Sequence, residues 1–245
     1  MRVGVLALQG GFAAHARAVT LLGHAPIEVR ALRDLRGVQA LILPGGESTV
    51  MLDLLARDRA LEHALIDLVD SGAPVLATCA GLILIASRVH TQPESPAESG
   101  QHDGVASAQR MPADPEQRSL GLLDVEVRRN ARGRQVHSSQ ARDDSGRLPL
   151  VLIRAPRITR VGSAVEVLAT FEGEPVLVRE GRCVGATFHP ELTDDLSVHA
   201  HVLDGVPLPT QRTRVSIDES PRGSSSSSGP STAVTSMSGA ASAIR

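Results

Sequence analysis

The 245-residue sequence carries a formal net charge of −2 and contains no lysine, so all of its positive side chains are arginines. That balance gives no broad cationic surface for nucleic acid or an anionic membrane, and the missing lysine excludes a Schiff-base or P-loop lysine in this chain. No apolar run approaches the roughly 20 residues that span a bilayer, and the apolar start is too short for a signal peptide. We therefore expect a cytoplasmic protein with one main core, acting on a small molecule or a protein partner.

Three apolar runs in the first half of the chain each end in a turn and lead into a helix-like segment. Residues 2–8 end in Gln-Gly-Gly, residues 38–48 precede an amphipathic segment at 49–70, and residues 73–81 lead into a further apolar run that can continue as a helix. Buried strands that alternate with helices are typical of a parallel sheet. We predict an α/β fold with a mostly parallel central sheet flanked by helices on both faces.

The second half of the chain has a different pattern. Residues 89–118 are rich in Pro, Ser, Gly and charge, which predicts a long surface loop. Short strand-like segments follow in close succession and suggest antiparallel additions to the sheet; they are residues 121–128, 149–153, 165–170, 175–179 and 183–188. The end of the chain is Ser-rich and poor in large apolar residues. We therefore predict a folded domain at 1–205 and a disordered low-complexity tail at 210–245.

Cys79 stands between a strand-like and a helix-like run, in the pattern small-x-nucleophile-x-Gly at residues 77–81. Such an elbow projects the nucleophile above the carboxyl edge of a sheet, and the start of the following helix favours a thiolate. The N–H of Ala80 would point toward a developing oxyanion. The alternative is a cysteine that only packs, the role we assign to Cys183. With no CxxC spacing, no metal site or disulfide framework is predicted.

A thiol nucleophile needs a base, and the base needs a group that orients it. Of nine histidines, His189 alone follows an apolar strand and stands beside a proline and an acid. We expect the proline to hold the backbone extended, so that His189 and Glu191 project to the same side. Taken alone, His189 is also explained as a core or capping histidine. His199 and His201 diverge on a predicted helix, so a metal pair there is not expected.

Two glycine-containing turns have a functional and a plain interpretation. In LPGGES, Gly45 and Gly46 let the backbone approach a ligand, and N–H groups at the start of the next helix could hold a carboxylate or complete an oxyanion hole. A simple turn with Ser48 as N-cap explains the same letters almost as well. LQGGFAAH could bind phosphate, but a plain turn is the better interpretation of a lone Gly-Gly.

The ordered motifs LQGGFAAH, LILPGGEST, TCAGLILIA, RNARGRQ, IRAP and FHPELTDD resemble, in combination, the glutaminase subunits of pyridoxal 5'-phosphate synthase. These are class I, triad-type glutamine amidotransferases with a flavodoxin-like fold. The resemblance covers residues 1–203 and makes 1–205 a glutaminase domain. It implies hydrolysis of L-glutamine to glutamate and ammonia, without a cofactor or metal. A separate synthase subunit would accept the ammonia.

The resemblance also implies roles for individual residues. Cys79 would be the nucleophile, with His189 and Glu191 completing a catalytic triad. The N–H groups near Gly46 and Ala80 would form the oxyanion hole. The implied glutamine-binding residues are Gly46, Glu47, Ser48, Arg129, Ile153 and Arg154. Arginine suits a carboxylate because its planar fork binds both oxygens at once.

Several positions depart from the pattern of the family. Ala77 stands where the elbow usually has glycine, and Arg128 and Arg132 flank the predicted substrate arginine where Glu and Phe are usual. Two other hypotheses remain at this point. In the first, the chain is a glutaminase subunit of a histidine, anthranilate or purine pathway. In the second, it is a catalytically silent regulatory subunit. The intact triad residues argue against the silent subunit.

Overall fold

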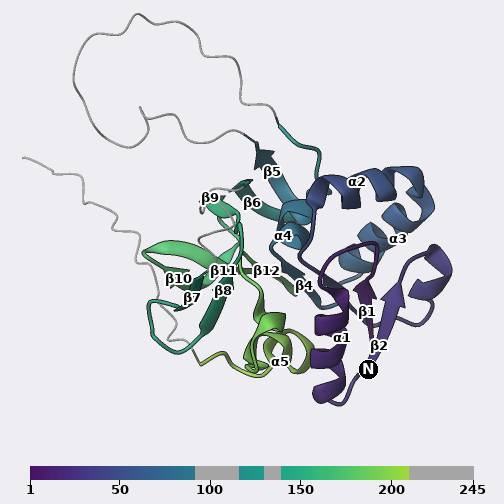
Figure 1. The fold of residues 1–245 in the computed structure, drawn as a ribbon. Coiled ribbons are helices and arrows are strands. Elements are labelled where there is room, and N and C mark those ends of the chain that lie inside the picture. Colours follow the sequence, from purple (N-terminus) through teal and green to yellow (C-terminus); the bar gives the residue numbers. More distant parts are fainter. Residues whose placement is uncertain (92–115, 130–138, 210–245) are drawn as a thin grey trace, which may run out of the picture. The chain divides into compact units, whose positions relative to one another are not determined.

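A seven-stranded sheet forms the centre of the computed structural model, which describes residues 1–91, 116–129 and 139–209 (Figure 1). Its strand order is β10-β11-β12-β4-β3-β1-β2, and the last five of these pair in parallel. The parallel strands are β1 (Arg2–Leu6), β2 (Ala25–Val29), β3 (Ala40–Leu43), β4 (Val75–Thr78) and β12 (Cys183–Ala186). The predicted mostly parallel α/β sheet is confirmed. It forms because each of these runs, apart from β2, is almost wholly buried.

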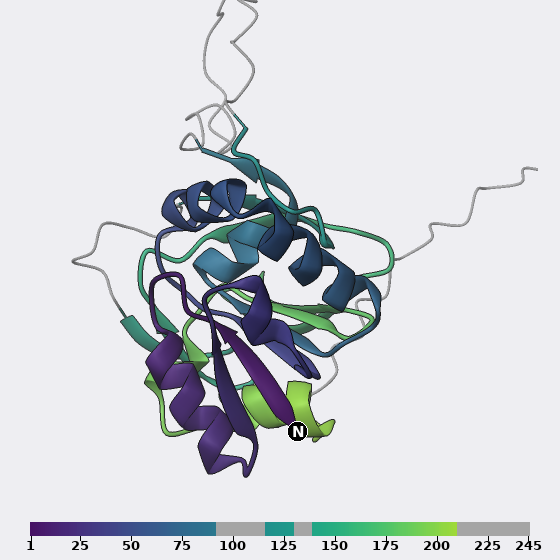
Figure 2. The same ribbon diagram turned by 90° about the vertical axis from the view of Figure 1, so that its right-hand side faces the viewer.

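Helices cover both faces of the sheet, as predicted (Figure 2). Leu41 and Leu43 of β3 pack in one core cluster with α2 (Ser48–Arg57), α3 (Arg59–Asp70) and α4 (Ala80–Ile85). The alternate residues Ala40 and Ile42 pack in a second cluster with α1 (Phe12–Leu21) and α5 (Ser197–Asp204). Successive strand residues point to opposite faces, so one short apolar strand serves both cores.

Antiparallel strands extend the sheet beyond β12. They are β11 (Glu174–Glu180) and β10 (Glu166–Phe171), and the predicted antiparallel additions are confirmed there. The predicted antiparallel addition at 183–188 is wrong in one respect, because its strand β12 belongs to the parallel part of the sheet and is antiparallel only to β11. The remaining short strands form two separate sheets. One contains β5 (Ala86–His90), β6 (Leu123–Arg128) and β9 (Arg157–Val161), and the other contains β7 (Ser139–Arg142) and β8 (Pro149–Leu152).

The helix after Cys79 is shorter than the apolar pattern indicates. The run that could continue as a helix gives a six-residue α4 and then turns into β5, where Arg88, Val89 and His90 pair with β6. Periodicity cannot separate a buried helix from a buried strand, and pairing with β6 decides the outcome. The expected loop at 89–118 therefore starts after His90, and Glu116 already bridges back to that residue. Residues 92–115 lie outside the described part of the chain.

The amphipathic segment at 49–70 forms two helices instead of one. Asp58 lies between them and caps α3, because its carboxylate accepts a hydrogen bond of 3.0 Å from the Leu61 N–H. Two 3₁₀ helices, η1 (Leu32–Leu35) and η4 (Pro190–Leu192), complete the described elements. Within the described ranges no helix is long and apolar enough to cross a membrane. The predicted tail at 210–245 lies outside them.

Candidate active site

Cys79 occupies a sharp bend between β4 and α4. Its φ of 47° and ψ of −103° are unusual for a residue with a side chain, and its N–H donates to the Ala186 carbonyl over 2.8 Å. Gly81 allows α4 to approach β3 closely, since a Cβ at Gly81 would clash with the Leu43 carbonyl. Ala77 is fully buried in β4, so alanine is accommodated where the family usually has glycine. The strand-bend-helix arrangement is the elbow that the sequence predicts.

His189 and Glu191 reach the same place from the carboxyl end of β12. The His189 N–H donates to the Val151 carbonyl of β8 over 2.9 Å, and its Nδ1 lies 2.8 Å from Glu191 Oε1. The predicted contact between His189 and Glu191 is present, but the prediction of an extended backbone around Pro190 is wrong. Pro190 begins the 3₁₀ turn η4, because its fixed φ also suits the first position of a helical turn.

The charges at this site favour a protonated imidazole. Burial alone would lower the pKa of His189, but hydrogen bonds to Cys79 and Glu191, and their charges, raise it to about 10. Burial alone would raise the pKa of the Glu191 carboxyl, but the hydrogen bond from His189 and the proximity of His15 lower it. A carboxylate thus holds an imidazolium beside the thiol, an arrangement suited to nucleophilic attack by sulfur.

The two glycine turns pack against each other and against the imidazole. The Gly11 N–H donates to the Gly45 carbonyl over 3.0 Å, and a Cβ at Gly10 would overlap that carbonyl. A Cβ at Gly45 would overlap Cε1 of His189 and lie 3.4 Å from Cys79 Cβ. Both turns therefore need glycine for close approach. The Gly-Gly of LQGGFAAH is more than a plain turn, because it supports the turn beside the thiol.

Predicted substrate residues gather at the start of α2. Glu47, not Ser48, is the N-cap of this helix, since its carboxylate accepts a hydrogen bond of 3.3 Å from the Thr49 N–H. Ser48 follows as the first helical residue and is buried. The sequence alternative with Ser48 as N-cap is therefore wrong. The same carboxylate oxygen, Oε1, also accepts from a second donor.

That second donor is Arg129, which follows β6. Its Nη2 donates to Glu47 Oε1 over 2.8 Å, and its Nη1 donates to Thr49 Oγ1 over 3.0 Å and to Gln117 Oε1. Gln117 in turn donates to Ser48 Oγ over 3.3 Å. Sequence reasoning missed Gln117, which lies in a polar stretch without a pattern. Arg129 is ordered by these contacts although Arg128 departs from the family, whereas Arg132 lies outside the described residues.

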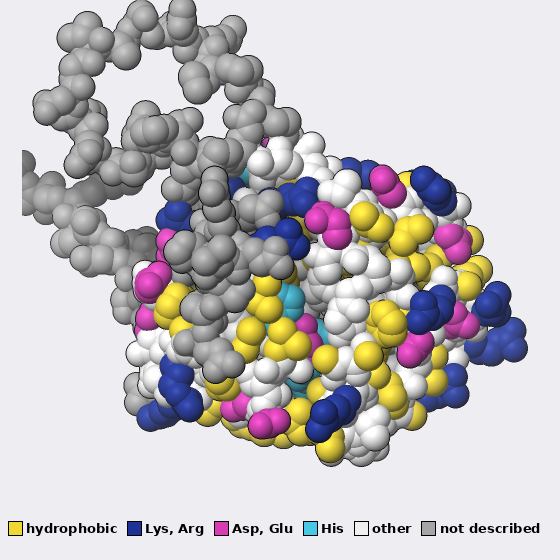
Figure 3. Space-filling view, in the orientation of Figure 1, with side chains coloured by type: hydrophobic (Ala, Val, Ile, Leu, Met, Phe, Trp, Pro, Cys, Tyr) yellow, Lys and Arg dark blue, Asp and Glu magenta, His cyan; other side chains and the backbone are white. Residues whose placement is uncertain are grey.

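A cleft of about 370 Å³ joins these groups. Ile153 and Arg154 line it opposite the elbow, with the Ile153 carbonyl 3.9 Å from Cys79 Sγ and Arg154 at a φ of 46°. The cleft brings together every residue predicted for the site, namely Gly46, Glu47, Ser48, Cys79, Ala80, Arg129, Ile153, Arg154, His189 and Glu191. Figure 3 shows histidine and acidic side chains in an opening bordered by hydrophobic side chains. Among the described residues, no cluster of His, Cys, Asp and Glu could hold a metal ion.

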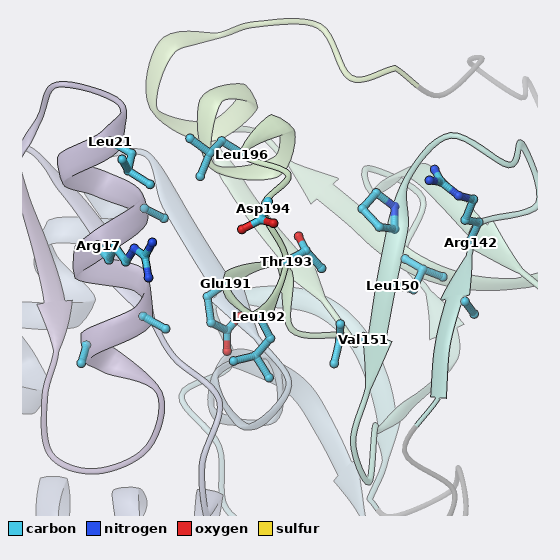
Figure 4. A pocket seen from close by; sticks show the side chains of 15 residues that line it. Arg17, Leu21, Arg142, Leu150, Val151, Glu191, Leu192, Thr193, Asp194 and Leu196 are labelled. Carbon is cyan, nitrogen blue, oxygen red and sulfur yellow. The ribbon is translucent and has the colours of Figure 1, made fainter.

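A larger groove of about 1020 Å³ adjoins the cleft between α1 and the β7-β8 pair (Figure 4). Arg17 and Leu21 line it from α1, and Leu150 lines it from β8. The groove shares Glu191 and Leu192 with the cleft. The η4 turn therefore separates the thiol side of the site from a second open surface.

Two buried histidines behind the triad were also missed. His15 of α1 is fully buried, with Nε2 at 3.3 Å from Glu191 Oε2 and 3.2 Å from Thr78 Oγ1. Its Nδ1 lies 2.9 Å from Nε2 of the buried His199. His201 points elsewhere and contacts the Val206 carbonyl, so the expected divergence of the two α5 histidines is confirmed. The sequence signal for His15 was its place four residues after the Gly-Gly turn, at the end of a motif.

The fold and this site define a class of protein: an α/β protein with a cysteine at a strand-to-helix elbow and a histidine-carboxylate pair beside it. A family model described as "SNO glutamine amidotransferase family" matches residues 5–98 and 104–206. The chain therefore belongs to the SNO glutamine amidotransferase family.

Individual proteins support the same assignment. The chain is 41% identical, over 84% of its length and 100% of the relative, to "Pyridoxal 5'-phosphate synthase subunit PdxT" of Thermotoga neapolitana. It is 43% identical to the protein of the same name from Solibacter usitatus, over 81% of the chain and 96% of the relative. A crystal structure of a glutamine amidotransferase superposes with a TM-score of 0.66 at 39% identity, covering 83% of this chain and 99% of that one.

Proposed function

We propose that this protein hydrolyses L-glutamine to L-glutamate and ammonia through a thioester on Cys79, and supplies the ammonia to the synthase subunit of a pyridoxal 5'-phosphate synthase. The observation that carries the proposal is the meeting of Cys79 with His189 and Glu191 in one cleft, although the thiol and the His-Glu pair come from two chain segments more than a hundred residues apart. Membership of a glutamine amidotransferase family gives that arrangement its substrate.

The chemistry divides into two acyl-transfer steps. The Cys79 thiolate attacks the side-chain carboxamide carbon, and N–H groups near Gly46 and Ala80 stabilise the negative oxygen. His189 gives its proton to the departing nitrogen as the C–N bond breaks, which releases ammonia and leaves a thioester. His189 then takes a proton from water as the water oxygen attacks the thioester, the C–S bond breaks, and glutamate leaves with the Cys79 thiolate and the imidazolium restored. Glu191 orients the imidazole throughout.

The substrate's α-carboxylate and α-ammonium groups bind at the start of α2. Arg129 offers a planar fork to the carboxylate, and Glu47 offers a carboxylate to the ammonium group. These two side chains pair with each other in the free protein, 2.8 Å apart. Ser48, Ile153 and Arg154 complete the walls of the cleft. When glutamine binds, the ion pair between Arg129 and Glu47 is replaced by two ion pairs with the substrate, one from each side chain. Little net charge is therefore buried.

The choice of pathway follows the relatives. Those with about 40% identity carry the name of a pyridoxal 5'-phosphate synthase subunit, which does not favour histidine, anthranilate or purine synthesis. The intact site argues against a silent regulatory subunit. Neither nucleic acid nor a membrane is part of the proposal, and the reaction is placed in the cytoplasm.

The test is a glutaminase assay on the purified full-length chain, alone and with a synthase subunit of this pathway. We expect equal amounts of glutamate and ammonia, and a higher rate with the synthase. Ammonia release stimulated only by an acceptor enzyme of another pathway would select that pathway. No hydrolysis with any acceptor would contradict the proposal and favour the silent subunit.

We further propose that residues 1–205 are the glutaminase domain and that the tail at 210–245 is dispensable for hydrolysis. The family model ends at residue 206, before the Ser-rich sequence begins. A chain truncated after residue 214 should keep the wild-type kcat and KM. A large loss of either activity or synthase stimulation would contradict this assignment.

A further inference from the structure

Two buried histidines extend the row of polar groups behind the proposed triad. Glu191 presents Oε1 to His189 at 2.8 Å and Oε2 to His15 at 3.3 Å. His15 continues the row to His199, with 2.9 Å between the two ring nitrogens. The segments that supply these groups are α1 near the start of the chain, and η4 and α5, which follow each other closely more than 160 residues later.

His15 touches both sides of the catalytic centre. Its Nε2 lies 3.2 Å from the hydroxyl of Thr78, the residue before Cys79, and faces Glu191 on the other side. One imidazole thus connects the strand that carries the proposed nucleophile to the acid that orients the proposed base. A side chain in that place can fix the relative position of both.

Two buried atoms in the row lack good hydrogen bonds. Within the described residues, neither Glu191 Oε2 nor His199 Nδ1 has a hydrogen-bond partner, and both atoms are inaccessible to solvent. A buried carboxylate oxygen without a donor is unfavourable because it has lost its water and gained no partner, and a buried ring N–H without an acceptor is unfavourable for the same reason. The placement of protons on His15 and His199 decides how many such groups remain.

Only one arrangement of protons suits both atoms. If His15 carries its proton on Nε2, that N–H lies between two acceptors, Thr78 Oγ1 at 3.2 Å and Glu191 Oε2 at 3.3 Å, and Nδ1 accepts from an Nε2–H of His199. Nδ1 of His199 then carries no proton and is an acceptor without a donor. For a buried ring nitrogen without a partner, this state is less unfavourable than an N–H without an acceptor. The opposite tautomers set two lone pairs against each other at Glu191 and bury an N–H of His199 without an acceptor.

We propose that His15 is a positioning residue for this site, placing its Nε2–H between Thr78 Oγ1 and Glu191 Oε2, and that His199 fixes this tautomer by donating from Nε2 to Nδ1 of His15. The role of the pair rests on the proposed glutaminase function. The tautomers themselves do not, because they follow from contacts among the protein's own groups.

The electrostatic surroundings agree with two neutral rings. Burial lowers the pKa of His15 to about 4, against the opposing charge of Glu191 and with the help of His189. Burial and the neighbouring His15 lower the pKa of His199 to about 3. The other titratable or charged groups that face the row, or line the groove beside it, are Cys79, Asp195, Arg17, Arg142 and Asp194.

Nuclear magnetic resonance tests the tautomers directly. Long-range ¹H–¹⁵N correlation on protein labelled at histidine nitrogens distinguishes Nε2–H from Nδ1–H in neutral rings, and spectra of His15→Leu and His199→Leu assign the two rings. We expect both to be neutral Nε2–H tautomers at pH 7. An Nδ1–H tautomer of His15, or a charged ring at either position, would overturn the proposal.

Kinetics of paired variants test the positioning role. His15→Leu removes the donor to Glu191, and we expect kcat to fall about 10- to 100-fold while KM stays within about 3-fold, since His15 does not line the cleft. His15→Gln keeps an N–H donor near the Nε2 position and should recover most of that loss. Equal kcat values for the leucine and glutamine variants would contradict a positioning role, as would a wild-type kcat in His15→Leu.

The pH profile separates positioning from general packing. Without the donor, the pKa of Glu191 rises, so the acid limb of kcat/KM should move to higher pH by about one unit in His15→Leu. His199→Leu should shift it in the same direction by less, and His199→Gln, which keeps a donor near Nε2, should not shift it. The positioning role of His15 would be overturned if the acid limb of kcat/KM did not move in His15→Leu. It would also be overturned if the acid limb lay at the same pH in His199→Leu and His199→Gln.

The proposed function and the tautomer assignment can be contradicted independently of each other. If the wild-type protein releases no ammonia but both histidines show Nε2–H signals, the proposed function fails and the tautomer assignment stands. If glutamine is hydrolysed but the tautomers are reversed, the function stands and the inference fails. Circular dichroism and thermal unfolding identify a variant that does not fold. The His199 pair and the wild-type spectra then carry the test.

Discussion

The two ends of the cleft are built differently. At the triad end, the side chains of Glu191 and His189 are 1% and 12% exposed, and backbone turns fix their places. At the α2 end, the side chains of Glu47 and Arg129 are 43% and 19% exposed and neutralise each other. A buried hydrogen-bonded carboxylate has no substitute partner in water, whereas an exposed ion pair contributes about 0–1 kcal/mol and exchanges readily.

This difference matches the tasks proposed for the two ends. The catalytic groups must be in place before the substrate arrives, because moving them during the reaction would raise the activation free energy. Groups that hold the substrate must release their present partners when its charges arrive. Substitutions at the triad end should therefore reduce kcat, and substitutions at the α2 end should raise KM.

The largest effect is expected from Cys79→Ala. Removal of the attacking sulfur should reduce kcat by at least about 10⁴-fold, while the fold persists because only one buried atom is lost. Cys183→Ala is the matched control, since Cys183 is also a buried cysteine but lies within β12 and does not line the cleft. Ammonia release and thermal unfolding measure both variants. Wild-type turnover in Cys79→Ala, or equal losses in the two variants, would contradict the assignment.

A smaller effect is expected from Gly45→Ala, which tests the backbone that fixes His189. The new methyl group would overlap the imidazole edge, so the ring must move away from the thiol. A displacement of this kind should reduce kcat about 100-fold without removing any catalytic group. The kcat of the folded variant, checked by circular dichroism, is the measurement. An unchanged kcat would show that the site tolerates a displaced ring.

The α2 end should respond in KM. Arg129→Lys keeps a positive charge but loses the planar fork, so we expect KM for glutamine to rise about 10-fold with kcat within about 3-fold. Arg179→Lys is the control, because Arg179 of β11 also forms a partly exposed ion pair, with Glu166 of the edge strand β10, but does not line the cleft. Steady-state kinetics with glutamine measure both. A fall in kcat alone would mean that Arg129 acts on the chemistry instead of on binding.

The triad end was also the more predictable end from sequence. Cys79 and His189 lie at the ends of buried strands, where strand periodicity and turn chemistry fix the backbone, and parallel strands bring their carboxyl ends to one edge. The parallel sheet and its two helical layers were predictable for the same reason. The split of 49–70 at Asp58 and the change from α4 to β5 depended on capping and on pairing with β6, which periodicity does not encode.

The residues that were missed depend on contacts between distant segments. Gln117 joins Ser48 to Arg129, and His15 joins Thr78 to Glu191. Gln117 has no local pattern that separates it from an ordinary polar residue, and the only local signal for His15 is its place at the end of the LQGGFAAH motif. Family resemblance supplied Arg129 and Ile153, whose own sequence neighbourhoods carried no chemical signal. The structure adds the second layer of polar contacts that keeps the first in place.

The smallest expected effect concerns stability, and it separates the buried row from the exposed α2 end. His15 and His199 have pKa values lowered to about 4 and about 3, below the 6.5 of an unfolded chain. Above pH 6.5 the rings are neutral in both states, so their contribution is fully present. As the pH falls toward about 4, the unfolded state binds protons first and the folded state loses stability, by up to about 1.4 kcal/mol per pH unit for each ring.

Urea unfolding between pH 4 and pH 7 measures this slope, and the comparison of variants isolates each ring. In His199→Leu the dependence of the free energy of unfolding on pH should be shallower by about one proton, because that ring no longer titrates. Arg129→Lys should leave the slope unchanged, since its exposed ion pair involves no buried histidine. A slope in His199→Leu equal to that of the wild type would mean that His199 takes up its proton at the same pH in the folded and unfolded states. Below about pH 6.5 the folded ring would then be an imidazolium, and the neutral row behind Glu191 would not persist there.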